Sequence, residues 1–110
     1  MEESKRDTDV DGFKLDMGKL RFDLVPPEAI KEIAKVMTKG CEKYPPNNWK
    51  KVDDLKNRYL AALYRHLNAW QLGENNDPDT GISHLSHALT NMCFLVWDEQ
   101  DNLCERGEER

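Results

Sequence analysis

The sequence predicts an all-α fold, a small helical bundle that carries a short extended arm at its N-terminus. Three segments hold apolar residues at helical spacing, at about 27–40, 54–72 and 80–97. Residues that typically begin and end helices (proline, aspartate and glycine) flank the first two. An alternating pattern, typical of extended chain, is found only before the first helix.

The arm lies in residues 12–25, after a polar stretch, 1–11, that we expect to be flexible. Phe13, Leu15 and Met17 alternate with polar residues, and the alternation resumes after Gly18 and Lys19. This pattern predicts either a small hairpin or an extended arm packed on the helices.

The first helix is expected to begin at Pro26-Pro27-Glu28 and to end near Gly40. A second should begin after Asp53 or Asp54 and end at Gly73, and a third should be capped by Asp79 or Thr80 and run to about Trp97. The third helix is the most apolar, so it should lie centrally or at a dimer interface, and we expect a homo-oligomer. Its predicted buried face consists of Ile82, Leu85, Leu89, Met92, Cys93 and Val96.

Composition narrows the function classes. A chain of 110 residues is one domain, here 12–100, followed by a charged tail, 101–110, that we expect to fray. The formal net charge of −5 argues against binding extended nucleic acid, yet it allows a nucleotide pocket with local positive charge. The sequence has no membrane-length apolar run and a polar N-terminus, which together with three unpaired cysteines indicates a cytoplasmic protein without membrane contact.

The three histidines form the main candidate site. His84 and His87 are spaced i, i+3 and share a helix face, while His66 lies on the preceding helix. Glu74 and Asp77 lie in the loop between the two helices, so an antiparallel pair would bring all five side chains together. Imidazole and carboxylate can hold a divalent metal. Each residue also has a plainer interpretation as a hydrogen-bonded core histidine or a loop cap.

A nucleotide is the second ligand that the sequence suggests. Lys19, Arg21 and Arg65 are basic residues beside apolar positions and could hold phosphates. Asn48 and Trp49 lie in one loop, where an amide and an indole could read and stack on a base. The alternatives are solvated surface cations and a tryptophan that belongs to the core.

These segments together resemble a phage and prophage family of dATP/dGTP diphosphohydrolase domain proteins, over about residues 14–97. The resemblance is carried by the block from Met17 to Ala29, by Gly40–Tyr44 with Asn48-Trp49, and by Arg65-His66-Leu67, Ala69-Trp70, Gly73-Glu74, Asp77–Gly81, His84-Leu85, His87-Ala88 and Asn91. It implies a fold like that of the MazG-type nucleoside triphosphate pyrophosphohydrolases. It also implies cleavage of a purine dNTP to dNMP and pyrophosphate in a bacterial host, and it places Asn91 among the nucleotide-binding residues.

One departure matters for the chemistry. MazG-type enzymes bind Mg²⁺ with acidic motifs on two helices. If the second and third helices of this chain are equivalent to those two, the segment around Arg65-His66 takes the place of the first motif and His84–His87 takes the place of the second. Three outcomes stay open. In the first, a divalent metal (Mg or Mn, with Co or Zn as alternatives) is held by His84, His87, Glu74 and Asp77. The catalytic residues are then His66 and Glu74, and His66 acts as an extra ligand or as a proton-transfer group. In the second outcome, other acidic residues carry out catalysis. In the third, the chain binds and sequesters a nucleotide signal without cleaving it. The other acids are Glu28, Glu32 and Glu42.

Overall fold

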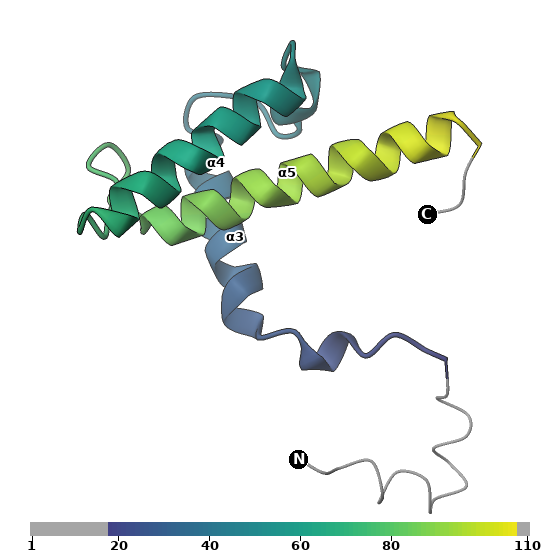
Figure 1. The fold of residues 1–110 in the computed structure, drawn as a ribbon, viewed down its shortest axis with the longest axis horizontal. Coiled ribbons are helices and arrows are strands. Elements are labelled where there is room, and N and C mark those ends of the chain that lie inside the picture. Colours follow the sequence, from purple (N-terminus) through teal and green to yellow (C-terminus); the bar gives the residue numbers. More distant parts are fainter. Residues whose placement is uncertain (1–17, 108–110) are drawn as a thin grey trace, which may run out of the picture.

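The computed structural model describes residues 18–107 and confirms the all-α class, with three α-helices and no strand in that range (Figure 1). The helices are α3 (Pro27–Gly40), α4 (Leu55–Gln71) and α5 (His84–Glu105), joined by loops that include short 3₁₀ turns at Phe22–Leu24 and Asn48–Lys51. The predictions made for 1–17 and for 108–110 lie outside the described residues. No helix of residues 18–107 is long and apolar enough to cross a membrane.

The first helix begins and ends as predicted. Pro27 occupies the first turn of α3, where its missing N–H costs nothing, and Glu28 lies near the positive end of the helix dipole. The helix ends at Gly40, and Tyr44 N–H returns to the Gly40 carbonyl. Of the predicted arm, 12–25, the structure describes only 18–25, and this part contains a 3₁₀ turn at Phe22–Leu24 and is not buried against the helices. Its apolar side chains are largely exposed: Leu20, Phe22 and Leu24.

The second helix follows a constrained loop. Asp54 is the N-cap of α4, as predicted, but its side chain makes no capping bond and accepts from Asn57 Nδ2 at 3.0 Å instead. Asp54 and Asn47 both have left-handed backbone, with φ of 54° and 70°. These two residues therefore bracket the segment that carries Trp49.

The third helix differs from the prediction at both ends. Its cap is Ser83, whose hydroxyl accepts from the Leu85 N–H at 3.1 Å, whereas the Thr80 hydroxyl is already bonded to Asp77. The predicted end near Trp97 is too early, because α5 continues to Glu105 and the turn that ends it contains Gly107, with φ of 80°. Residues 101–105 thus belong to the helix.

The two long helices run antiparallel, and α3 crosses α5 (Figure 1). Two ring pairs set the register of α4 against α5. Tyr59 and Phe94 lie 4.8 Å apart, and His66 and His87 lie 4.6 Å apart, measured between ring centroids. Tyr59 and His66 are seven residues apart on α4, and so are His87 and Phe94 on α5. At a rise of 1.5 Å per residue, the two ring pairs are therefore about 10 Å apart.

The predicted buried face of α5 is wrong. Leu85, Leu89, Met92 and Val96 are 37–49% exposed, and the buried apolar residues of the described chain are Leu55, Leu63 and Ala88. Polar residues of α5 are buried instead, and hydrogen bonds to neighbouring groups offset the cost of burying them. These residues are His84, Ser86, His87, Thr90 and Asn91.

Candidate functional site

The three histidines meet where α4 ends and α5 begins. His66 Nδ1 and His84 Nδ1 are 2.8 Å apart, and His84 Nε2 is 2.8 Å from Glu74 Oε1. The His66 ring stacks on His87 with an angle of 8° between the planes. His84 is 4% exposed and Glu74 is exposed, so the chain of bonds runs from the surface into the interior.

The bonds assign the protons in this chain. Ionised Glu74 only accepts, so His84 Nε2 carries the hydrogen and donates it. In neutral His84 the Nδ1 atom then accepts, and His66 Nδ1–H is the donor. The remaining nitrogen, His66 Nε2, keeps a lone pair and makes no hydrogen bond to residues 18–107. A carboxylate and a buried imidazole thus orient a second imidazole as a base.

A second network holds His87. The Thr80 hydroxyl donates to Asp77 Oδ2 at 3.0 Å and lies 2.7 Å from His87 Nε2, which is 3.6 Å from the same Asp77 oxygen. Because the hydroxyl hydrogen goes to Asp77, His87 Nε2 donates to Thr80 Oγ1. The Ile82 N–H donates to that oxygen as well, at 3.2 Å.

The loop between the helices holds both carboxylates by backbone bonds. His84 N–H donates to the Asn75 carbonyl at 2.8 Å, and Asp77 N–H donates to the Ile82 carbonyl at 2.9 Å. Gly81, with φ of 74°, closes the turn through a 2.7 Å bond from its N–H to the Asp77 carbonyl. The loop is therefore an ordered wall of the site.

Burial lowers the pKa of His66 and of His87 below the ordinary 6.5. For His66, the neighbouring imidazoles His87 and His84 lower the pKa further, and Asp77 opposes them. For His87, Asp77 again raises the pKa and His84 lowers it. Both rings are consequently neutral near pH 7, the state in which an imidazole can accept a proton.

We expect the free energy of unfolding to fall as the pH is lowered from 7.5 to 5. The unfolded chain, with histidines of ordinary pKa, binds more protons in this window than the folded chain, so acid favours unfolding. The loss begins near pH 6.5 and ends once both rings are protonated in the folded state. Urea midpoints measured at several pH values test this.

Variants His66→Gln and His87→Gln are the controls for the pH experiment. Each should flatten the pH dependence. The Glu32 carboxyl, whose pKa is lowered first by a Ser86 bond and then by one from Lys35, titrates below 4.5 and does not interfere. An unchanged slope in both variants would contradict the assignment.

The four predicted metal ligands contact one another in two pairs, His84 with Glu74 and His87 with Asp77. Within residues 18–107, no group of three or more His, Cys, Asp or Glu side chains is placed to hold a metal ion.

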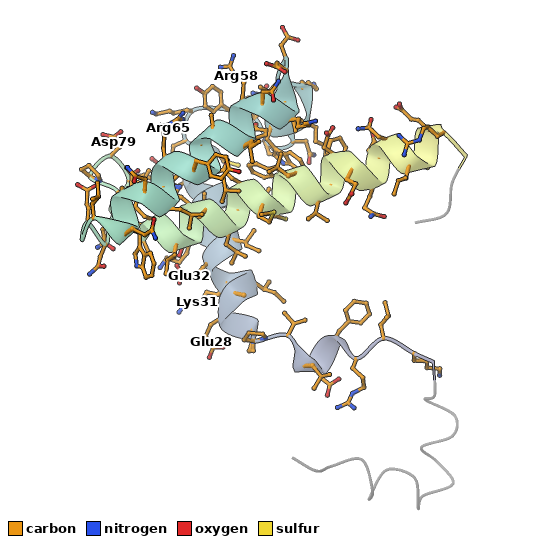
Figure 2. All side chains as sticks on the ribbon, viewed as in Figure 1. Glu28, Lys31, Glu32, Arg58, Arg65 and Asp79 are labelled. Atoms are coloured by element: carbon orange, nitrogen blue, oxygen red, sulfur yellow. The ribbon has the colours of Figure 1, made fainter. Side chains whose placement is uncertain are left out.

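The three alternative acids are on or just after α3. Glu28 is exposed at the start of the helix, and Glu42 pairs with Lys39 at 3.2 Å. Glu32 accepts from the Ser86 hydroxyl at 2.7 Å and pairs with Lys35 at 3.1 Å (Figure 2). Only Glu32 thus contacts the helix that carries two of the histidines.

The structure places two of the predicted phosphate-binding residues, Lys19 and Arg21, away from the histidines and Arg65 next to them (Figure 1). Segment 18–25, with Lys19 and Arg21, extends beyond the start of α3 and away from the α4–α5 loop, and Arg21 forms two bonds of 2.8 and 2.9 Å to Asp23 (Figure 1). Arg65 is exposed on α4 beside His66 (Figure 2). Asn91 is buried and donates to the His87 carbonyl at 2.9 Å.

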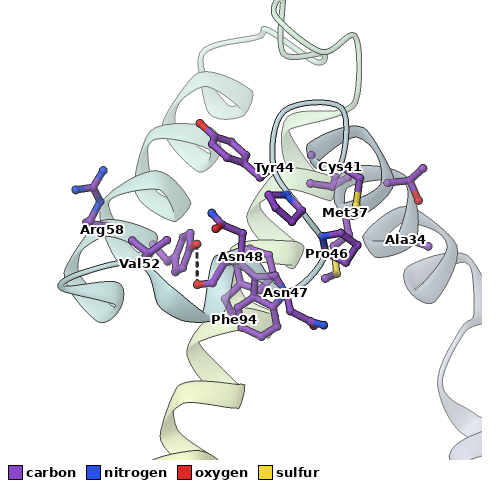
Figure 3. A pocket seen from close by; sticks show the side chains of 16 residues that line it. Ala34, Met37, Cys41, Tyr44, Pro46, Asn47, Asn48, Val52, Arg58 and Phe94 are labelled. Atoms are coloured by element: carbon purple, nitrogen blue, oxygen red, sulfur yellow. Dashed lines mark hydrogen bonds between the residues drawn. The ribbon is translucent and has the colours of Figure 1, made fainter.

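The predicted base-binding residues line an aromatic pocket of about 760 Å³ between α3, the 44–52 loop and α4. Trp49 stacks on Phe94 with 4.3 Å between centroids, and its backbone carbonyl accepts from Tyr59 at 3.1 Å. The Trp49 indole N–H is buried without a hydrogen-bond partner. Figure 3 shows Asn48 and Phe94 near the centre of this view, with Met37 and Cys41 on the α3 side.

Sequence reasoning missed Thr80 as a member of the site. The sequence suggested Thr80 only as a helix cap, whereas its hydroxyl bonds to both Asp77 and His87. The spacing of three residues between Asp77 and Thr80 was a usable signal, because Asp side chains commonly bond to nearby hydroxyl and N–H groups in turns.

Comparison with known proteins places the chain. Residues 9–106 match the family model described as "dATP/dGTP diphosphohydrolase, N-terminal". Over 88 residues the chain is 33% identical to a protein of Salmonella phage PMBT28 named dATP/dGTP diphosphohydrolase, covering 78% of this chain and 29% of the relative. The chain thus spans less than a third of that relative, and no solved structure matches it. By its match over most of its length, the chain belongs to the dATP/dGTP diphosphohydrolase N-terminal domain family.

Proposed function

We propose that this domain hydrolyses a purine deoxynucleoside triphosphate to the monophosphate and pyrophosphate. The observation that carries the proposal is the Glu74–His84–His66 hydrogen-bond chain, which leaves a neutral imidazole nitrogen available as a base. The names of the family and of the phage relative supply the substrate class.

In this mechanism, His66 Nε2 takes a proton from a water molecule as the water oxygen bonds to the α-phosphorus. The bond from that phosphorus to the oxygen that bridges to the β-phosphorus breaks, and pyrophosphate leaves. Positive charge developing on His66 is stabilised through His84 by the Glu74 carboxylate. His87 stacks on His66 and holds its ring plane.

The purine ring of the nucleotide is placed in the aromatic pocket, which contains Asn48 and Trp49, the two residues that the sequence predicts to bind it. The Tyr59–Phe94 end of the pocket lies about 10 Å along the two helices from the histidines, which suits a nucleotide lying between them. The Asn48 amide, which lines this pocket, offers a donor and an acceptor to the ring nitrogens or carbonyl of a purine. Lys19, Arg21, Arg65 and Asn91 stay predicted nucleotide contacts.

A divalent metal is implied by the resemblance to metal-dependent pyrophosphohydrolases, where it neutralises phosphate charge. We propose that the domain requires Mg²⁺ or Mn²⁺, and Co²⁺ and Zn²⁺ are the other candidates. The described side chains form no ready cage, so the triphosphate itself would supply part of the coordination.

The test incubates the chain with dATP, dGTP, dCTP and dTTP, each with Mg²⁺, Mn²⁺, Co²⁺ or Zn²⁺ in turn, and separates the products by chromatography. We expect dAMP or dGMP with an equal amount of pyrophosphate, and slower release from the pyrimidines. Release of inorganic phosphate in place of pyrophosphate would contradict the proposed bond cleavage. His66→Gln is the control for a contaminating hydrolase.

Binding without cleavage is the second candidate. The separation of the four predicted metal ligands into two pairs favours it. A nucleotide that binds and is recovered intact from every metal condition would establish a nucleotide-sequestering protein. Cyclic dinucleotides belong in the same panel, since they are a class of defence signal.

We also propose that the domain acts as a homo-oligomer. Residues 18–107 of one chain bury three apolar side chains, too few to stabilise a domain of this size, while α5 presents a row of exposed ones. The row has spacings of four, three and four residues, the pattern of helices that pair with a like helix. A second copy of α5 is therefore its proposed partner. The row consists of Leu85, Leu89, Met92 and Val96.

A further inference from the structure

A row of lysines follows one face of α3. Lys31, Lys35 and Lys39 are spaced four residues apart, so they lie one above another on successive turns. They line an open hollow of about 510 Å³, whose opposite side is formed by Thr80 and Ile82 of the loop before α5. A protein of net charge −5 thus presents three cations along one hollow.

This hollow adjoins the aromatic pocket. Ala34 and Thr38 of α3 line both, and they lie between the lysine row and the pocket-lining residues Met37 and Cys41. A ligand can therefore place an aromatic group on one side of these two small residues and an anionic group on the other.

The hollow also reaches the histidines. Thr80 lines it and is bonded to His87, whose ring stacks on His66. An anion held by the lysines would therefore lie beside the loop that fixes the proposed base. The opposing carboxylates are those of Glu32 and Glu42, which pair with Lys35 and Lys39 at 3.1 and 3.2 Å. These partly exposed pairs are weak, and a polyanion can replace the carboxylates.

We propose that the phosphates of the bound nucleotide lie along Lys31, Lys35 and Lys39, with the base in the aromatic pocket on the other side of Ala34 and Thr38. This inference rests on the proposed nucleotide as ligand. It does not require cleavage, and it assigns the phosphates to residues outside the set predicted from the sequence. Lysine ammonium groups suit a flexible triphosphate, which they bind as point charges.

The test measures binding by calorimetry with α,β-methylene-dATP, whose P–C–P bridge cannot be hydrolysed at the proposed bond, and with deoxyadenosine. Lys31→Gln, Lys35→Gln and Lys39→Gln are each expected to weaken binding of the analogue about five- to tenfold, the typical effect of losing one charged contact. Affinity for deoxyadenosine should stay unchanged. Lys56→Gln, an exposed lysine on α4, is the matched control and should change neither.

Each outcome has a distinct meaning. Loss of analogue binding in the α3 variants alone, together with competition by inorganic tripolyphosphate, supports the lysine row even if no dNTP is hydrolysed, in which case only the proposed activity fails. Equal affinity for the analogue in all four variants would contradict phosphate binding by the lysine row, even if turnover is observed. Failure of the unmodified chain to bind the analogue would contradict it as well. Lys35→Arg, which keeps the charge, should restore most of the affinity and excludes a loss caused by misfolding.

Discussion

Replacing His84 with alanine is expected to reduce turnover of the purine substrate by about 10²- to 10⁴-fold, the range that one proton-transfer group contributes. Both ring nitrogens of His84 are bonded, one to His66 and one to Glu74. Removing the ring leaves His66 without the acceptor that fixes its tautomer and without the carboxylate that stabilises its charged form. The fall should be in kcat, with KM nearly unchanged, because the base pocket lies two helical turns away.

Two further variants separate chemistry from folding. His84→Gln keeps a donor for Glu74 and an acceptor for His66 but lacks an imidazole that can share the positive charge, so it should fold with normal helix content and still lose turnover. The double variant His66→Gln, His84→Gln should be no slower than the worse single one, because residues of one relay are not additive. Near-normal kcat in folded His84→Ala would remove the relay from the mechanism.

The second large effect is expected from Leu89→Glu. This residue is in the middle of the exposed apolar row of α5, and a carboxylate there would have to be buried without a partner in a paired assembly. We expect the variant to be monomeric by light scattering and its thermal midpoint to fall by 10 °C or more, an order-of-magnitude figure for losing several kcal/mol of interface in a domain of about 100 residues.

A matched substitution tests whether the position matters. Leu72→Glu introduces the same change at a residue that is 79% exposed just after α4 and outside the row. It should leave the mass and thermal midpoint nearly unchanged. If the unmodified chain is itself monomeric, or Leu89→Glu keeps its mass, the proposed pairing through α5 is wrong.

The helices could be predicted because their signals are local. Proline, aspartate and glycine mark ends, and apolar spacing marks a helix regardless of what it packs against. The burial of α5 could not be predicted by the same logic, since the apolar side of an isolated helix normally faces the core. His84 and His87 reverse this expectation because partners from other segments satisfy them, and sequence spacing does not reveal such partners.

For the site, the residues that come together could be predicted, but the contacts between their atoms could not. That His66, His84 and Glu74 converge follows from an antiparallel pair with a short loop, and the structure confirms their proximity. Which atoms face each other depends on side-chain rotation, so a metal cage and a hydrogen-bond chain look identical in sequence. Lys31 and its row were missed because lysines at helical spacing usually belong to a solvated face, and only the position of the 77–82 loop distinguishes this row.

The left-handed backbone of Asn47 and Asp54 limits how the pocket loop can vary in related proteins. Outside glycine, that conformation is tolerated best by asparagine and aspartate, and β-branched residues are nearly excluded from it. Relatives that hold an aromatic residue at position 49 in the same way should therefore have glycine, asparagine or aspartate at both bracketing positions. A relative with valine or isoleucine at either one would need a different loop, and with it a different base preference.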